Sequence, residues 1–315
     1  MSGVLLAAKS QTHTSLRAWF ASAGTARRTI AVVGTYVVCA SLFGLVVGLQ
    51  HANPIGVYQS LFESAITNPG ALGEVVLRAV PICLAALAVS VPARAGLVNV
   101  GGEGQLIVGA VATTGVGVAL QGSIPGPLDW AAMAVAAMVC AGTWAGACGF
   151  LRTRLGANEA VTTLLLNFVA NDLMLYLIYQ PWKDPAGNGQ PESRPLTGSA
   201  VLPHFFGSSL NLGVIVAIAA AAAIWFSLQK TGWGFALRVV GGNKLAAKRS
   251  GLPVNHLLIS SMFVGGALAG LGGMLNLAGA QLQLLPGGTA TYGYIGFLAS
   301  FLGRHHPVKV VVAAL

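Results

Sequence analysis

Long apolar runs separated by short polar gaps dominate this sequence. A helix needs about 20 mostly apolar residues to cross the hydrocarbon core of a bilayer. Candidate runs are Ile30–Leu49, Val75–Val91, Leu97–Leu120, Ala131–Phe150, Val161–Tyr179, Leu212–Leu228 and Leu257–Leu277, with a weaker run at Tyr292–Leu302 and a last one from Val308 to Leu315. The pattern predicts an all-α, polytopic transmembrane bundle with about eight to ten membrane segments, some of them broken or re-entrant.

The basic residues orient these runs, because positively charged short loops stay on the cytoplasmic side of a membrane. With a cytoplasmic N-terminus, fourteen of the 17 Lys and Arg residues fall in inside gaps, and only Lys183 and Arg194 fall outside. We therefore predict a cytoplasmic N-terminal segment at residues 1–29 and a transmembrane domain at residues 30–315. Within that domain, residues 230–254 form a cytoplasmic loop and residues 181–211 an extracellular loop.

The composition excludes an ordinary soluble domain. Only 8% of the 315 residues are charged, against about 25% in soluble domains. The net charge of +9 does not indicate nucleic-acid binding, because the basic residues lie in separate gaps. Retention of cytoplasmic loops and contact with anionic membrane lipid account for them. The four cysteines all lie within apolar runs and are interpreted as packing residues.

Motifs for independent chemistry are missing from the sequence. It has no G-x-x-x-x-G-K-[ST] phosphate-binding loop, no His or Cys cluster with metal-ligand spacing and no nucleophile elbow. We expect no cofactor, no metal and no enzymatic activity of this chain. If ATP drives its function, a separate subunit must hydrolyse it.

Two glycine-rich segments interrupt the runs at membrane depth. The first, Ala95–Gln105, carries four glycines together with Asn99, Glu103 and Gln105; the second is Pro286–Gly296. Such backbone is tolerated in a membrane only where it is buried in protein or lines a watery cavity. Paired interruptions in two halves of a transporter point to a central solute site. Asn99, Glu103 and Gln105 are therefore candidates for the translocation path, although no residue-level repeat between the halves is evident.

A second polar group lies at the start of the run that follows. Asn158 and Glu159 are adjacent, and Thr162 and Asn167 follow at spacings of three to five residues, so the group forms a polar side of a helix. They either border the path or hold the bundle together by interhelical hydrogen bonds. Two further ionisable residues lie within runs. We expect Arg78 to form a structural ion pair and Asp172 to be a packed hydrogen-bonding group.

The inside gap Lys230–Pro253 contains the signals of a short, independently capped helix. Asn243 is a good N-cap, Lys244–Ser250 provides two turns, Gly251 suits a left-handed C-terminal position and Pro253 prevents continuation. A simple connector needs no such helix, whereas a docking element for a cytoplasmic partner does. The loop at 181–211 is either a surface for an extracellular partner or an idle connector.

Four stretches resemble the permease subunits of bacterial ABC importers for simple sugars and nucleosides, in the branched-chain amino acid and ribose-type permease superfamily. Ala95–Gln105 resembles the family segment AGLxNIGxEGQ, and Gly156–Asn167 resembles GANEVxxTIMLN. Gly234–Gly251 is similar to GxxxRAVGxNPxAARYxGI, with Lys244 in place of the usual Pro and Arg249 in place of an aromatic residue. Ile295–Pro307 corresponds more weakly to IAVALLGRxxP.

The resemblance implies a multi-pass permease subunit in the bacterial cell membrane. It also implies three kinds of protein partner: a second, paralogous permease, a cytoplasmic ABC ATPase, and an extracellular substrate-binding protein or lipoprotein. The helix at Asn243–Gly251 would be the coupling helix in an ATPase groove. The residues expected at that interface are Arg238, Asn243, Leu245, Ala246, Ala247 and Gly251. Replacing Ala247 with Glu is expected to place a charge in the groove and abolish coupling.

The solute implied by the resemblance is a nucleoside, with a ribose-like simple sugar as the alternative. Two other classes stay open on the residues alone: an ion-coupled secondary transporter and a non-transporting membrane scaffold. The last apolar stretch, Val310–Leu315, is too short to cross a membrane. We interpret it as a re-entrant end or, preferably, as a sign that the natural protein continues.

Overall fold

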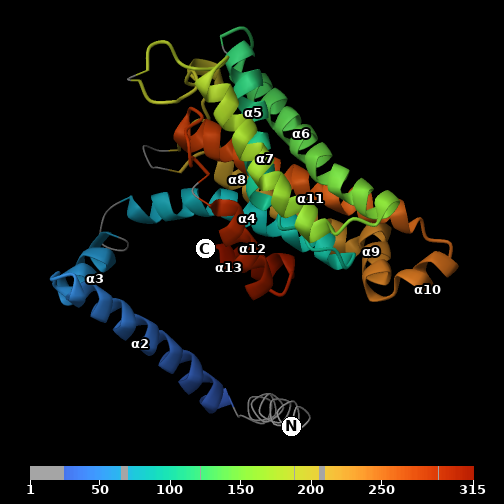
Figure 1. Ribbon diagram of the computed structural model, residues 1–315, viewed down its shortest axis with the longest axis horizontal. Coiled ribbons are helices and arrows are strands. Elements are labelled where there is room, and N and C mark those ends of the chain that lie inside the picture. The colour runs from blue at the N-terminus through green and yellow to red at the C-terminus, as the bar shows by residue number, and fades with distance from the viewer. Residues whose placement is uncertain (1–24, 65–69, 121, 188, 206–209, 290) are drawn as a thin grey trace, which may run out of the picture. The chain divides into compact units, whose positions relative to one another are not determined.

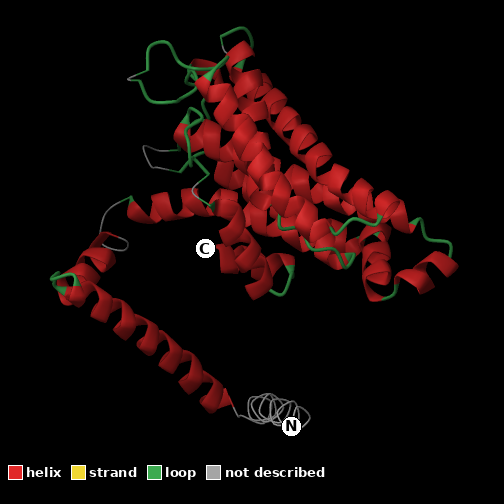
Figure 2. Ribbon diagram, viewed as in Figure 1, coloured by secondary structure: helices red, strands yellow, loops and turns green. Residues whose placement is uncertain are grey.

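The computed structural model describes residues 25–64, 70–120, 122–187, 189–205, 210–289 and 291–315. The chain divides into two compact units, Met1–Pro69 and Gly70–Leu315, each described here by itself. Helices and their connecting loops make up the described residues, and none of these residues forms a strand (Figure 2). The prediction of an all-α polytopic bundle is confirmed.

The first unit contains α2 (Thr25–Leu49) and α3 (Pro54–Phe62). Helix α3 was not predicted from the apolar runs, although its start carries a recognisable capping signal. The side chain of Asn53 accepts hydrogen bonds from the backbone N–H groups of Ile55 and Gly56, and Pro54 occupies the first turn. Helix α2 begins within the predicted N-terminal segment 1–29, of which residues 1–24 lie outside the described residues.

The second unit carries the rest of the helices. They are α4 (Ala71–Arg94), α5 (Gly102–Leu120), α6 (Gly126–Leu155), α7 (Glu159–Tyr179), α8 (Leu212–Lys230), α9 (Gly232–Gly242), α10 (Lys244–Arg249), α11 (Val254–Asn276), α12 (Tyr292–Leu302) and α13 (Pro307–Ala314), with the 3₁₀ turn η2 (Gly198–Ala200) and the π-helix η3 (Leu277–Gln281). Among the described residues, 6 helices are long and apolar enough to cross a membrane. The chain is therefore a multi-pass membrane protein.

Helix α11 is the centre of this second unit and packs against α4, α5 and α6 (Figure 1). Small residues let the backbones approach closely. A methyl group added at Gly266 would collide with the carbonyl oxygen of Ala141 on α6, and one added at Gly273 would collide with that of Leu106 on α5. Such close approach is typical of helix packing in lipid, where dispersion contacts replace the hydrophobic effect.

Both predicted interruptions are present, but each is shorter than expected. Helix α4 continues through Pro81 and Pro92 to Arg94, and non-helical backbone then extends only to Gly101. Glu103 and Gln105 therefore belong to the first turns of α5. In the second interruption, α12 begins at Tyr292, so the last glycines of the predicted segment are helical. Each interruption is an irregular segment that leads into the start of a helix.

The large loop between α7 and α8 packs onto the end of α11 rather than hanging free. Leu196 and Leu202 are buried. The N–H of Leu196 donates to the carbonyl of Leu282 at 2.7 Å, and the N–H of Leu202 donates to the carbonyl of Ala278 at 3.0 Å. The described part of this loop is thus an ordered cover over η3 and the residue that follows it.

Candidate functional site

The N-terminal ends of α5 and α12 meet and form the centre of the candidate site. A methyl group added at Gly102 would lie 3.4 Å from the carbonyl oxygen of Gly293, so the two helix starts touch through backbone. The carboxylate of Glu103 accepts a hydrogen bond from the N–H of Gly293 at 2.7 Å and another from the hydroxyl of Thr289. Glu103 is only 8% exposed. It therefore places an acceptor at the positive end of α12, where the first N–H groups have no partner within the helix.

A reciprocal amide pair fixes the turn that leads into α5. The side-chain amide of Asn99 donates to Oε1 of Gln105 at 3.0 Å, and the amide of Gln105 donates back to Oδ1 of Asn99 at 2.9 Å. The same Oδ1 accepts from the N–H of Gly101 at 3.0 Å. Asn99 and Gln105 are both buried. The pair thus satisfies buried polar groups within the non-helical segment itself.

Side chains of α7 satisfy the backbone of this segment from the other side. The hydroxyl of Thr163 accepts from the N–H of Val100 at 3.1 Å. Asn167 uses both ends of its amide: Oδ1 accepts from the N–H of Gly104 at 2.8 Å, and Nδ2 donates to the carbonyl of Val100 at 3.0 Å. Its Nδ2 also lies 3.4 Å from the hydroxyl of Tyr294 on α12. Asn167 therefore connects α5, α7 and α12.

Glu159 completes this face of α7. Its Oε1 accepts from the N–H of Val98 at 3.5 Å, and its Oε2 forms an ion pair with Arg152 at 3.2 Å. Glu159, Thr163 and Asn167 are spaced by four residues, so they line up along one side of the helix. Their side chains accept from the N–H groups of Val98 and Val100 in the non-helical segment and of Gly104 in the first turn of α5, so one side of α7 satisfies this irregular chain inside the bundle.

The structure brings together five of the seven residues predicted for the translocation path: Asn99, Glu103, Gln105, Glu159 and Asn167. Asn158 and Thr162 lie outside this network. Asn158 is exposed and caps α7 by accepting from the N–H of Ala160 at 3.0 Å. Thr162 donates to the carbonyl of Asn158 at 2.8 Å.

Thr163 and Thr289 belong to the site but were not among the residues predicted from the sequence. A strict four-residue spacing from Glu159 would have selected Thr163 in place of Thr162, because only that spacing keeps side chains on one narrow stripe of a helix. No local signal identifies Thr289, since its contact with Glu103 joins residues 186 positions apart.

Two expectations about charged residues within the runs were wrong. Arg78 and Asp172 are both exposed on the surface of the described chain. Across the described ranges the single ion pair is that of Arg152 with Glu159, so Arg78 does not form the expected structural pair. Asp172 is not packed into the bundle because it points away from the stripe that contains Thr163 and Asn167.

Helix α10 forms as the sequence predicted, with caps at both ends. The side chain of Asn243 accepts from the N–H groups of Leu245 and Ala246, each at 3.0 Å. Gly251 adopts φ 78°. Its N–H donates to the backbone carbonyl of Lys248 at 3.1 Å, and the N–H of Leu252 donates to the backbone carbonyl of Ala247 at 3.1 Å. This pair of bonds is the Schellman arrangement that ends helices at a left-handed glycine.

The surface of α10 differs from the expectation in one respect. Leu245 is 59% exposed and Ala246 is also exposed, but Ala247 is fully buried within this chain. From the sequence, Ala247→Glu was expected to place a charge in a partner's groove. The charge would instead be buried inside the permease, because Ala247 is the side chain of α10 that packs against the rest of the chain.

Arg238 also has an internal role. It lies in α9, a helix that the sequence analysis did not predict, and donates to the carbonyl of Leu228 near the end of α8. Of the six residues expected at the ATPase interface, Asn243, Leu245, Ala246 and Gly251 are exposed, whereas Arg238 is only partly exposed.

A second contact at the same end of the bundle joins α4 to the turn between α12 and α13. The guanidinium of Arg94 donates to the carbonyl of His305 at 3.0 Å, and Nδ1 of His305 lies 3.0 Å from the hydroxyl of Ser300. Burial lowers the pKa of the His305 imidazole below its ordinary value of 6.5, and the nearby positive charge of Arg94 lowers that pKa further.

Comparison with known proteins places this architecture in a family. Residues 71–315 match the family described as the permease component of the branched-chain amino acid transport system. The glucose ABC transporter permease protein of Haloferax volcanii is 35% identical over 292 residues, covering 89% of this chain and 76% of that protein. The guanosine ABC transporter permease protein of Bacillus subtilis is 32% identical over 264 residues, covering 82% of this chain and 74% of the relative.

A nucleoside ABC transporter permease protein of Lactococcus lactis is 29% identical over 289 residues, covering 89% of this chain and 79% of that relative. These proteins are transport subunits, and the ATPase and substrate-binding functions of such systems lie in separate partners. The multi-pass bundle fits the same description. The chain belongs to the family of branched-chain amino acid transport system permease components and is a permease subunit of an ABC importer in the plasma membrane.

Proposed function

We propose that this permease subunit imports a nucleoside. The observation that carries the proposal is a contact between two of the stretches that resemble simple-sugar and nucleoside permeases. Oδ1 of Asn167, in Gly156–Asn167, accepts a hydrogen bond from the N–H of Gly104, in Ala95–Gln105, at 2.8 Å. Relatives named for guanosine and nucleoside transport in two organisms support the same solute class. A simple sugar is the second candidate, favoured by the relative named for glucose.

The proposed path for the solute runs beside the junction of α5 and α12. In this proposal, Glu103, Asn99, Gln105 and Asn167 position the two helix starts that border the path. These side chains are buried in the described conformation, and each is hydrogen-bonded to backbone or side chains of the junction. In this proposal they therefore act on transport by holding neighbouring backbone in place. In this proposal the border continues toward the start of α7 through Glu159, with Asn158 and Thr162 beside it but outside the hydrogen-bonded network.

The proposed energy source is a cytoplasmic ABC ATPase that docks on α10, so the chain needs no cofactor of its own. In this scheme residues 230–254 are the coupling loop on the cytoplasmic side, and residues 181–211 face an extracellular substrate-binding lipoprotein. A second, paralogous permease completes the membrane portion. ATP shifts the bundle between outward-open and inward-open states only if the ATPase binds α10 differently in the two states.

Uptake in a host that lacks its own nucleoside and sugar importers tests this proposal. The chain is expressed together with its ATPase, its second permease and its binding protein, and labelled guanosine uptake is measured with unlabelled nucleosides and glucose as competitors. Nucleosides are expected to compete and glucose is not. Competition by glucose alone would instead favour the sugar. Uptake that persists after ATP depletion but stops with a proton or sodium ionophore would contradict the ABC mechanism.

A further inference from the structure

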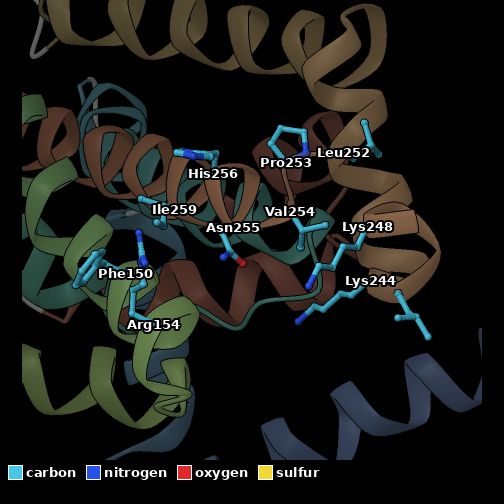
Figure 3. A pocket seen from close by; sticks show the side chains of 11 residues that line it. Phe150, Arg154, Lys244, Lys248, Leu252, Pro253, Val254, Asn255, His256 and Ile259 are labelled. Atoms are coloured by element: carbon cyan, nitrogen blue, oxygen red, sulfur yellow. The ribbon is translucent and has the colours of Figure 1, made fainter. Parts of the chain in front are cut away.

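A cavity of about 730 Å³ lies between the end of α6, helix α10 and the start of α11 (Figure 3). The function proposed above assigns no ligand to this cavity, although α10, on which the ATPase is proposed to dock, forms one of its sides. We propose that this cavity binds an anionic phospholipid, with the phosphate among its basic side chains and an acyl chain along its apolar side.

The charge of the lining selects an anion. Arg154 on α6 and both Lys244 and Lys248 on α10 line the cavity, and none of the described residues that line it is acidic. In Figure 3 the two lysine amino groups lie near each other on one side and Arg154 lies on the opposite side, with Asn255 between them. Three cations converging on one space attract a phosphate, and basic pockets at the cytoplasmic ends of transmembrane helices bind anionic headgroups.

The apolar part of the lining favours a lipid over a soluble anion. Phe150 precedes Arg154 by one helical turn on α6, and Ile259 follows Asn255 by one turn on α11. Both apolar residues therefore lie nearer the middle of their membrane-spanning helices than the polar residues do. Phe150 is 49% exposed, and the Arg154 guanidinium lies 5.9 Å from the centre of its ring. A free phosphate would leave these apolar groups uncovered, whereas a phospholipid would cover them.

A lipid in this cavity would contact three helices at once. Helix α10 has only 6 residues, and Ala247 is its one buried side chain. A headgroup held by Lys244 and Lys248 on one side and by Arg154 on the other adds a second attachment of α10 to the spanning helices. We therefore infer that anionic lipid steadies the orientation in which α10 meets its partner.

Lipid binding to the purified importer complex tests the proposal independently of the solute. Native mass spectrometry in detergent would compare adducts of phosphatidylglycerol and phosphatidylcholine. The test variant carries Arg154→Gln, Lys244→Gln and Lys248→Gln. The matched control carries Lys230→Gln, Arg304→Gln and Lys309→Gln, which remove the same charge from exposed positions outside the cavity. We expect the test variant to bind phosphatidylglycerol roughly tenfold less than wild type or weaker, and the control to bind it normally.

Three outcomes would overturn the proposal. Equal phosphatidylglycerol binding by the test variant would show that the lipid binds elsewhere. Displacement of the lipid by inorganic phosphate alone would identify a soluble-anion site. Loss of the ATPase from the complex with unchanged lipid binding would assign the cations to an acidic surface of that partner. If the triple variant fails to fold, Arg154→Gln alone, on α6, must still weaken phosphatidylglycerol binding.

Discussion

The carboxylate of Glu103 accepts a hydrogen bond from the backbone N–H of Gly293 at 2.7 Å, although the two residues lie 190 positions apart in the sequence. The contact joins the two glycine-rich interruptions of the chain into one junction. Each interruption leads into the start of a helix, and the carboxylate from the first helix lies at the positive end of the second. A broken helix in a membrane requires partners for its free backbone groups, and here Glu103 supplies one of them to the start of α12.

Removing the Glu103 carboxylate should destabilise this junction. Glu103→Ala leaves the N–H of Gly293 and the hydroxyl of Thr289 without an acceptor in a buried site, which costs about 1–3 kcal/mol for each such group. We expect a lower midpoint of thermal denaturation in detergent together with reduced uptake. Glu103→Gln retains one acceptor oxygen and should recover most of the stability. An alanine variant with unchanged denaturation and uptake would rule out this role of Glu103.

Adjacent threonines on α7 provide a matched comparison. Thr163→Val keeps the shape of the side chain but removes the acceptor for the N–H of Val100, so we expect a loss of about 1–3 kcal/mol. Thr162→Val removes only a bond to the carbonyl one turn earlier and should cost less than about 0.5 kcal/mol. Thermal denaturation of both purified variants checks the difference, and equal effects would contradict the assigned network.

Helix α10 allows folding and partner contact to be separated. Leu245→Glu adds a charge at an exposed position, so we expect normal insertion and denaturation but loss of ATPase co-purification and at least about a tenfold loss of uptake. Ala247→Glu adds the same charge at a buried position and should destabilise α10 itself. Lys309→Glu, at an exposed position on α13, is the control for added negative charge. ATPase retention by the Leu245 variant at wild-type level would contradict docking through this face.

The turn that contains His305 should lose stability in mild acid. Burial, and secondarily Arg94, lower the pKa of this imidazole in the folded chain below 6.5. As the pH falls through about 6.5, the unfolded chain therefore takes up a proton that the folded chain does not, and the stability contributed by the neutral imidazole is lost between 6.5 and the lowered pKa.

Denaturation midpoints measured from pH 8 to pH 5 check this expectation. The midpoint of the wild type should decrease below about pH 6.5, whereas His305→Gln should show a weaker decrease over the same range. His256→Gln removes an exposed histidine at the start of α11 and serves as the control. Identical pH profiles for the wild type and the His305 variant would exclude this histidine as the source.

The sequence by itself determined the features that depend on local chemistry. Apolar runs long enough to cross a bilayer predicted the spanning helices, and Asn243 and Gly251 predicted both ends of α10, because capping involves only neighbouring residues. The two interruptions were also evident, since glycine and polar residues at membrane depth need special surroundings whatever the fold. The same local pattern identified Asn99, Glu103 and Gln105 as candidate site residues. It did not predict which residues they bond.

Only the tertiary structure decided which side chains meet. Ala247 and Leu245 both lie in α10 two residues apart, yet one is buried and the other exposed, because the packing of α10 on its neighbours selects one face of the helix. The stripe of Glu159, Thr163 and Asn167 acquired its role when the backbone of Val98, Val100 and Gly104, from the irregular segment and the first turn of α5, came to lie beside it. Hydrogen bonds between distant residues depend on how whole helices pack. That packing cannot be predicted from a local sequence pattern.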